Sequence, residues 1–221
     1  KKGATVLHST PTDDAPVDQF NFDALKQLLQ EDSVLGQSGL ALLRQAATKQ
    51  HIGVLRQELS TLEANAGESA SDGALMKLGI GWYLLGQHAH AYDFLLPLTT
   101  NPMALYHLGE VCISRDRFEE AGQHFAAAAS NGGDVIVCTL QQVGAIRQAG
   151  DTQGAESLLR SIAQKAVSKA DYSFQMGCIL ADQGDTLGAI EYFERAVDMD
   201  PHHTRALFWL ANENDRMGND D

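Results

Sequence analysis

Apolar residues along the chain recur at helical spacing over most of its length. Between residues 22 and 30 they fall on one face of a helix, and Asn21 is placed to cap the first turn. Two further helices are predicted over residues 38–49 and 54–64, where leucines recur three, four and seven positions apart. No segment alternates apolar and polar residues as a strand does. The pattern therefore predicts an all-α protein.

A repeat with a period of 34 residues runs through the second half of the chain. Such a period is typical of stacked helical hairpins, in which small residues let the two helices of a hairpin approach closely. Each unit is predicted to consist of a helix, a turn rich in Gly and Asp, and a second helix. Five sets of residues recur at this interval: Gly109, Val143, Gly177 and Ala211; Ala121, Ala155 and Ala189; Phe125, Leu159 and Phe193; Ala128, Ile162 and Ala196; and Asp116, Gly150, Gly184 and Gly218.

This pattern resembles the tetratricopeptide repeat, a helix-turn-helix unit whose motif reads W-x2-L-G-x2-Y, then A, F, A and a closing P. Residues 170–203 match the motif best, and residues 102–135 match nearly as well. Residues 136–169 are weaker in the first helix and sound in the second. A shortened unit, residues 72–101, carries Pro97 in its second helix, which should truncate or kink that helix.

The resemblance implies a right-handed α-solenoid and divides the chain into three parts. Residues 1–20 are expected to be a flexible tail or linker, because they mix Thr, Ser, Asp and Pro without a helical period. Residues 21–71 form an N-terminal helical extension. Whether residues 36–69 within it are a degenerate repeat is left open, because leucines stand there where small residues belong. Residues 72–221 are the repeat array: 72–101, 102–135, 136–169, 170–203 and a partial unit, 204–221.

The partial last unit has the first helix and the turn residues Gly218 and Asn219, but no second helix. A solvating cap helix would have no need of a following turn. The sequence therefore favours a fragment that stops within a repeat.

The charge of the chain limits the kinds of partner that it can bind. Asp and Glu number 29 against 16 Lys and Arg, which gives a net charge of −13. This excess argues against binding nucleic acid or an anionic membrane surface, because both need clustered basic residues. No apolar run approaches the roughly eighteen residues of a membrane span. Residues 171–221 hold eleven acidic residues and three arginines, which favours a basic partner or serves solubility.

The three cysteines, Cys112, Cys138 and Cys178, are too few and too widely spaced for a disulfide framework, and no C-x-x-C pair suggests a zinc site. Free thiols favour a reducing compartment, so a cytoplasmic location is expected. Cys112 is expected in the core and Cys178 towards the groove described below.

Four histidines stand in two close pairs, His88 with His90 and His202 with His203. They are expected to be exposed loop residues, because no cysteine lies near either pair. Phosphate-binding, nucleotide-binding and nucleophile-elbow motifs are absent from the sequence. No catalytic site, metal site or cofactor is therefore predicted.

In tetratricopeptide arrays the first helices line a concave groove in which a partner peptide commonly lies. Large apolar residues on a merely solvated face would be unexpected, so either a partner or other helices of the chain, residues 20–30 included, should cover them. Replacing Tyr106 and Phe174 by Ala is expected to weaken partner binding with little change in melting. The groove positions implied by the resemblance are Met76, Ile80, Tyr83, Tyr106, His107, Glu110, Leu140, Gln141, Arg147, Phe174, Gln175, Phe208 and Asn212.

The family's carboxylate clamp uses Lys, Asn and Arg on three successive first helices to hold the C-terminus of a partner. The corresponding places here are Tyr106 with Glu110, then Gln141, then Asp171 with Gln175. An acidic side chain repels a carboxylate, so the clamp is disfavoured and a mixed apolar and polar peptide groove is expected.

The resemblance thus implies a non-catalytic module that binds a partner protein or peptide. Two alternatives remain open: a docking or regulatory region of a larger multidomain enzyme, and a structural scaffold that self-associates through the ends of the array.

Overall fold

The computed structural model describes residues 20–67 and 70–218, and within these ranges it holds thirteen α-helices and no strands, which confirms the all-α prediction. Residues 1–19, most of the predicted tail, lie outside the described residues, as does Asn219 of the last predicted turn. The helices are α1 Phe22–Gln30, α2 Gln37–Ala46, α3 Ile52–Ala66, α4 Asp72–Leu84, α5 His88–Leu95, α6 Pro102–Ile113, α7 Phe118–Ser130, α8 Val135–Gln148, α9 Thr152–Ser161, α10 Ala163–Ala166, α11 Ala170–Asp182, α12 Thr186–Met199 and α13 Thr204–Arg216.

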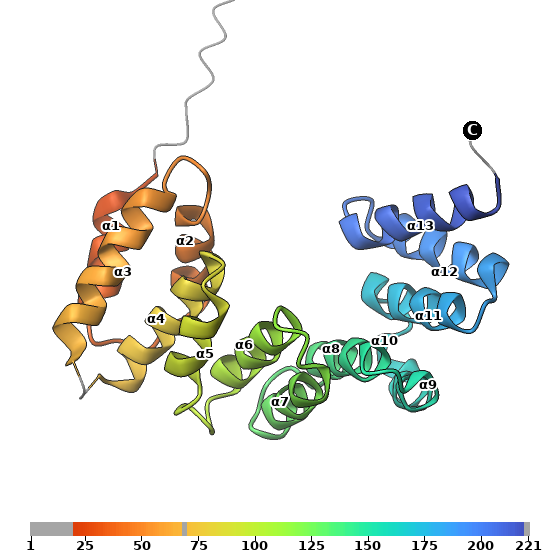
Figure 1. Ribbon diagram of the computed structural model, residues 1–221, viewed down its shortest axis with the longest axis horizontal. Coiled ribbons are helices and arrows are strands. Elements are labelled where there is room, and N and C mark those ends of the chain that lie inside the picture. The colour runs from red at the N-terminus through yellow and green to blue at the C-terminus, as the bar shows by residue number, and fades with distance from the viewer. Residues whose placement is uncertain (1–19, 68–69, 219–221) are drawn as a thin grey trace, which may run out of the picture.

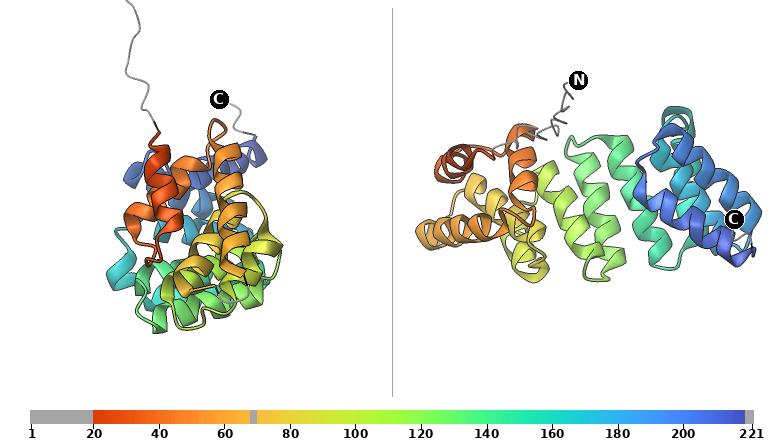
Figure 2. Two further views of the ribbon diagram at one scale, coloured as in Figure 1. Left: turned by 90° about the vertical axis from the view of Figure 1, so that its left-hand side faces the viewer. Right: turned by 90° about the horizontal axis from the view of Figure 1, so that it is seen from above.

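The helices follow one another along an arch, with α1–α3 at one end and α11–α13 at the other (Figure 1). The pairs α4/α5, α6/α7, α8/α9 and α11/α12 form successive hairpins, and each packs against its neighbour. Helices α6 and α8 lie towards the hollow of the arch, and α7 and α9 lie on its outer side. Seen from above, the hairpins stand side by side in chain order (Figure 2). The chain is therefore a solenoid, as the repeat predicts.

The small residues of the repeat allow the two helices of a hairpin to cross closely. A Cβ atom on Gly109 of α6 would lie only 2.5 Å from the ring of Phe125 on α7, and one on Gly177 of α11 would lie 2.6 Å from the ring of Phe193 on α12. Both rings are buried. The same contact thus recurs two repeats apart, because residues at this period occupy equivalent places in successive hairpins.

The turn between the two helices of a repeat needs a left-handed backbone. Gly150 and Gly184 have φ values of 96° and 83°, and Asp116, at the equivalent place, has φ 55°. Glycine adopts this region freely and Asp tolerates it better than most residues. The next residues, Asp151 and Asp185, cap α9 and α12 by accepting hydrogen bonds from backbone N–H groups. The predicted turns are therefore confirmed.

Two second helices depart from the regular length. Helix α5 ends at Leu95, two residues before Pro97, as predicted, because proline has no backbone N–H with which to continue the helical hydrogen bonds. A second helix forms in residues 136–169, where the motif match is sound, but it is short: α9 ends at Ser161, and α10 follows after a turn at Ile162. Ile162 is a bulky β-branched residue where the other units have alanine, and the helix is interrupted at that residue.

The N-terminal extension is anchored to the array through α4. Asn21 caps α1 as predicted, accepting a hydrogen bond of 2.9 Å from the backbone of Ala24. Helix α3 packs closely on α4, where Gly81 leaves room for Leu59. Helix α2 also contacts α4. The interpretation of residues 36–69 as a degenerate repeat remains an interpretation.

Candidate functional site

Two clefts lie between the first helices of the array. The first, here called the α2 cleft, has a volume of about 390 Å³ and lies between α2, α6 and the start of α8. The second, here called the α13 cleft, has a volume of about 300 Å³ and lies between α8, α11 and α13, next to the end of α6. Residues from successive first helices line both, so the two clefts are the candidate binding surface of the chain. The α13 cleft is lined by Ile113, Gln141, Gly144, Arg147, Gln148, Phe174, Gln175, Arg205 and Trp209.

One wall of the α2 cleft is formed by the N-terminal extension of the same chain. Tyr106 and His107 of α6, two of the predicted groove residues, form one wall, and Leu40 and Arg44 of α2 form another. The His107 imidazole lies 2.6 Å from a carboxylate oxygen of Glu110, which engages both side chains. Helix α2 thus faces this part of the predicted groove, and it is one of the helices of the chain that could cover the groove residues in place of a partner.

The predicted groove residues of α4 belong mainly to the core. Met76 and Ile80 are buried in the same apolar cluster as Leu40 and Leu43 of α2. Tyr83 is partly buried, and desolvation, followed by the nearby carboxylate of Glu110, raises its pKa to about 12. Met76 and Ile80 therefore serve helix packing, and they offer little surface to a partner.

The α13 cleft brings together four predicted groove residues, Gln141 and Arg147 of α8 with Phe174 and Gln175 of α11. Arg147 donates a hydrogen bond of 2.8 Å from Nη1 to Asp182. The remaining predicted residue of α8, Leu140, is buried in the core and does not line the cleft.

Helix α13 contributes residues that the sequence did not indicate. The predicted Phe208 is 67% exposed and lines neither cleft, and Asn212 is likewise exposed and outside both. Arg205 and Trp209 line the α13 cleft instead, four residues apart on one face of the helix. The guanidinium of Arg205 lies 4.8 Å from the centre of the Phe174 ring, within cation–π range.

Two further residues of α8 line this cleft although they were not predicted from the sequence. Gly144 and Gln148 line the α13 cleft at positions three and seven residues after Gln141. This i, i+3, i+7 spacing is a signal that was present in the sequence, because it places the three residues on one face of a helix.

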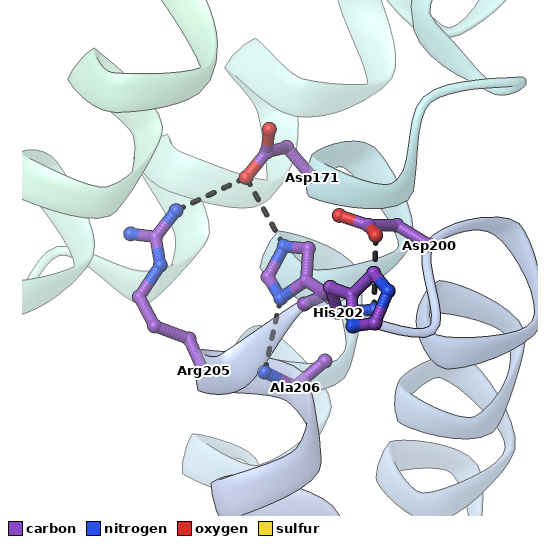
Figure 3. Close-up of polar contacts among 6 residues, drawn as sticks. Asp171, Asp200, His202, Arg205 and Ala206 are labelled. Atoms are coloured by element: carbon purple, nitrogen blue, oxygen red, sulfur yellow. Dashed lines mark hydrogen bonds and ion pairs between the residues drawn. The ribbon is translucent and has the colours of Figure 1, made fainter. Parts of the chain in front are cut away.

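An acidic residue fixes α13 against α11 at the rim of the α13 cleft (Figure 3). Asp171 Oδ1 accepts hydrogen bonds from Arg205 at 3.0 Å and from His203 Nε2 at 3.2 Å. The other ring nitrogen of His203 accepts from the backbone N–H of Ala206 and caps α13. His203 is therefore in the tautomer that carries its proton on Nε2.

The expectation of exposed loop histidines is wrong for His203, which is only 8% exposed. His88 and His90 are half-buried at the start of α5, and His90 lies 3.0 Å from a carboxylate oxygen of Glu63. His202 is exposed, as expected. The difference arises because a histidine at a helix start can cap the helix or pair with a carboxylate, and neither role shows in the sequence.

The cysteines are poorly suited to nucleophilic chemistry. All three are free and buried. Burial raises the pKa of Cys112 and of Cys178 to about 11, and it also raises the pKa of Cys138. A thiol reacts as the thiolate, so these groups are largely inert at neutral pH.

One cluster has donor atoms suited to a metal ion. Ligand atoms of Cys112, Glu120 and His124 lie within 4.8 Å of one another. However, Glu120 already accepts a hydrogen bond of 2.5 Å from Tyr92 and forms an ion pair with Arg117. The cationic guanidinium beside the carboxylate opposes a second positive charge, so the cluster is better explained as a packed polar network.

No helix in the described ranges combines the length and apolar character needed to cross a membrane.

Comparison with known proteins shows which proteins have a similar sequence or fold. Residues 174–212 match a family model described as tetratricopeptide repeat. No curated protein matches the sequence. Many solved structures share the fold. YrrB, described as a TPR protein with an unusual peptide-binding site, has a TM-score of 0.54 at 17% identity, with 85% of this chain and 98% of that chain covered.

The thermophilic TPR protein TTC0263 of Thermus thermophilus has a TM-score of 0.60 at 16% identity, with 80% of this chain and 97% of that chain covered. A chain of the APC/C hetero-tetramer Cut9–Hcn1 has a TM-score of 0.65 at 14% identity, with 81% of this chain but 36% of that chain covered. At these identities the likeness shows the fold alone. Together with the family match over residues 174–212 and the 34-residue period, it shows a tetratricopeptide-repeat fold.

Proposed function

We propose that this chain is a non-catalytic interaction module that binds a segment of a partner protein in the α13 cleft. One observation carries the proposal. Predicted groove residues from α8 and α11 converge in this cleft with Arg205 and Trp209 of α13. Aromatic and arginine side chains of this kind dominate the binding energy of protein interfaces. Three successive first helices thus present one continuous polar and aromatic surface.

The lining of the cleft is poorly explained by stability alone. Gln175 is only 4% exposed, and its Oε1 atom has no hydrogen-bond partner among the described residues. Polar groups that are buried without partners reduce stability, and native proteins keep few of them. Their presence at the meeting point of three helices favours a role in binding.

Charge indicates the class of partner. The two guanidinium groups of the cleft, Arg147 and Arg205, are each paired with a carboxylate, Asp182 and Asp171. The cleft therefore has no excess positive charge with which to attract an acidic ligand. Residues 171–221 carry a net charge of −8, with eleven acidic residues and three arginines. The partner segment is accordingly neutral or basic.

Peptide display against the purified chain, followed by calorimetry with the selected peptides, tests the proposal. The key variant is Gly144→Ala, because a Cβ atom there would lie 2.9 Å from Nε2 of Gln175 and would displace that side chain in the cleft. Gly122→Ala on α7 is the matched control. Its Cβ would lie 3.8 Å from the nearest side-chain atom, that of Ile146, which is an ordinary van der Waals distance.

We expect Gly144→Ala to weaken peptide binding at least tenfold and Gly122→Ala to leave it unchanged. Failure to select any peptide that binds in the cleft, or equal affinity for both variants, would reject the proposed function.

Self-association is a second candidate, favoured by one observation. Helix α13 exposes Leu207 and Phe208, and Met217 follows it, also exposed. Light scattering on the purified chain measures this directly, and a monomer at all concentrations would remove the candidate.

A further inference from the structure

The side chain of Gln175 is the least satisfied polar group of the α13 cleft. It is 4% exposed and lines the cleft, and its Oε1 atom has no hydrogen-bond partner among the described residues. Its amide lies over Gly144 of α8, where any larger residue would displace it. The neighbouring Nε atom of Arg147 is also buried without a partner in this part of the chain. The chain therefore places a free amide and a free guanidinium N–H in the same cleft.

The chemistry of these groups selects the ligand. A primary amide presents one donor group and one acceptor, whichever way it is turned, and Arg147 adds a further donor. A carboxylate offers acceptors only, and an ammonium group offers donors only. An amide offers both in the same planar group, so it can pair with Gln175 at both ends while also accepting from Arg147.

Such an amide can come from an Asn or Gln side chain of the partner or from its main chain. A second glutamine decides between these two sources. Gln141 of α8, which is partly exposed, also lines the cleft. One Asn or Gln side chain of a partner would satisfy only one of the two glutamines. An extended main chain presents a peptide group at every residue and can engage both, because its N–H and C=O groups are not used within a helix.

We propose that Gln175, together with Gln141, holds the main chain of an extended partner segment through its peptide groups, so that the side chain at the contacted residue matters little. This inference rests on the proposed function and deepens it. It predicts a cleft that tolerates many partner sequences but requires an unmodified backbone.

The test uses a peptide selected by display and a scan of single backbone N-methyl groups along it. N-methylation removes the N–H donor and keeps the side chain. We expect one position at which N-methylation lowers affinity for the native chain at least tenfold, while alanine at that position changes affinity less than threefold. Binding that instead depends on one Asn or Gln side chain, or on an Asp or Glu, overturns the proposal.

Variants of Gln175 assign the contact. Gln175→Met keeps the length of the side chain and removes both hydrogen-bonding groups, and Gln175→Glu removes the donor. Both should bind the native peptide at least tenfold more weakly, and N-methylation at the sensitive position should cost Gln175→Met no further affinity. Independent, additive losses would show that Gln175 does not contact that peptide group.

Thermal melting separates binding from a structural role. Because Gln175 is buried without partners among the described residues, Gln175→Met should melt no lower than the native chain. A clear decrease in melting temperature would make Gln175 a structural residue and would overturn the inference. Failure to select any cleft-binding peptide rejects both the proposed function and this inference. A bound peptide without coupling to Gln175 rejects this inference alone.

Discussion

The two clefts differ in what faces them. At the α2 cleft the chain covers its own first helices: Leu40 and Arg44 of α2 stand opposite Tyr106 and His107. At the α13 cleft the lining residues leave an unpaired amide, that of Gln175, and none of the described N-terminal helices lines it. The apolar residues at the N-terminal groove positions are thus explained by packing against α2. The unpaired amide of Gln175 thus distinguishes the α13 cleft, which is the proposed partner site, from the α2 cleft.

The difference can be tested first at Phe174, where the structure revises the expectation from sequence. Phe174 is 4% exposed, and its ring lies 5.0 Å from that of His203 and 6.0 Å from that of Phe193. Phe174→Ala should therefore lower the free energy of unfolding by about 3–5 kcal/mol, measured by urea denaturation and circular dichroism. A decrease in the free energy of unfolding below about 1 kcal/mol would show that Phe174 is a surface residue of the groove. The expectation from the sequence, weaker partner binding with little change in melting, would then hold.

The cover formed by α2 is tested by Leu43→Ala. Leu43 is fully buried in the cluster that includes Met76 and Ile80, so the substitution should cost about 2–5 kcal/mol. Cys138, which lines the α2 cleft, should then react faster with iodoacetamide, as mass spectrometry of the labelled peptide can measure.

Leu187→Ala, at an exposed position on α12, is the control and should change stability by less than about 0.5 kcal/mol. Unchanged labelling of Cys138 in Leu43→Ala would show that α2 does not protect the cleft.

A pH titration examines the packing beneath the α13 cleft. Desolvation raises the pKa of Cys178 to about 11 from an ordinary value of 9.0. Below pH 9 the thiol is protonated whether the chain is folded or unfolded, so its contribution to stability is fully present. As the pH rises from 9 to 11 the unfolded chain loses the proton first, and this contribution is lost.

Compared with Cys178→Ala, the native chain should therefore lose about 1 kcal/mol more between about pH 8 and about pH 10, measured by urea denaturation. Parallel pH profiles for the two proteins would mean that Cys178 is solvated.

The sequence predicted the parts of this molecule that repeat. The period placed the Gly177–Phe193 crossing and the turn at Gly184, because the same packing must recur in every hairpin. It could not predict the cover by α2, because a contact between α2 and α6 lies outside the repeat. On α13 the period indicated Phe208, whereas the helix presents Trp209 to the cleft. Single residues of that kind depend on the orientation of a helix.

The smallest effect on stability and peptide binding is expected from a substitution at Phe208. This residue tests whether α13 serves the cleft or contacts between copies of the chain. Its side chain is 67% exposed and lines neither cleft, so Phe208→Ser should change the free energy of unfolding by less than about 0.5 kcal/mol and leave peptide affinity unchanged. Light scattering on the same variant reports on self-association. A variant that dissociates an oligomer assigns α13 to contacts between copies of the chain. A variant that weakens peptide binding would instead extend the open surface beyond the α13 cleft, because Phe208 would then have to contact a ligand that reaches past Trp209.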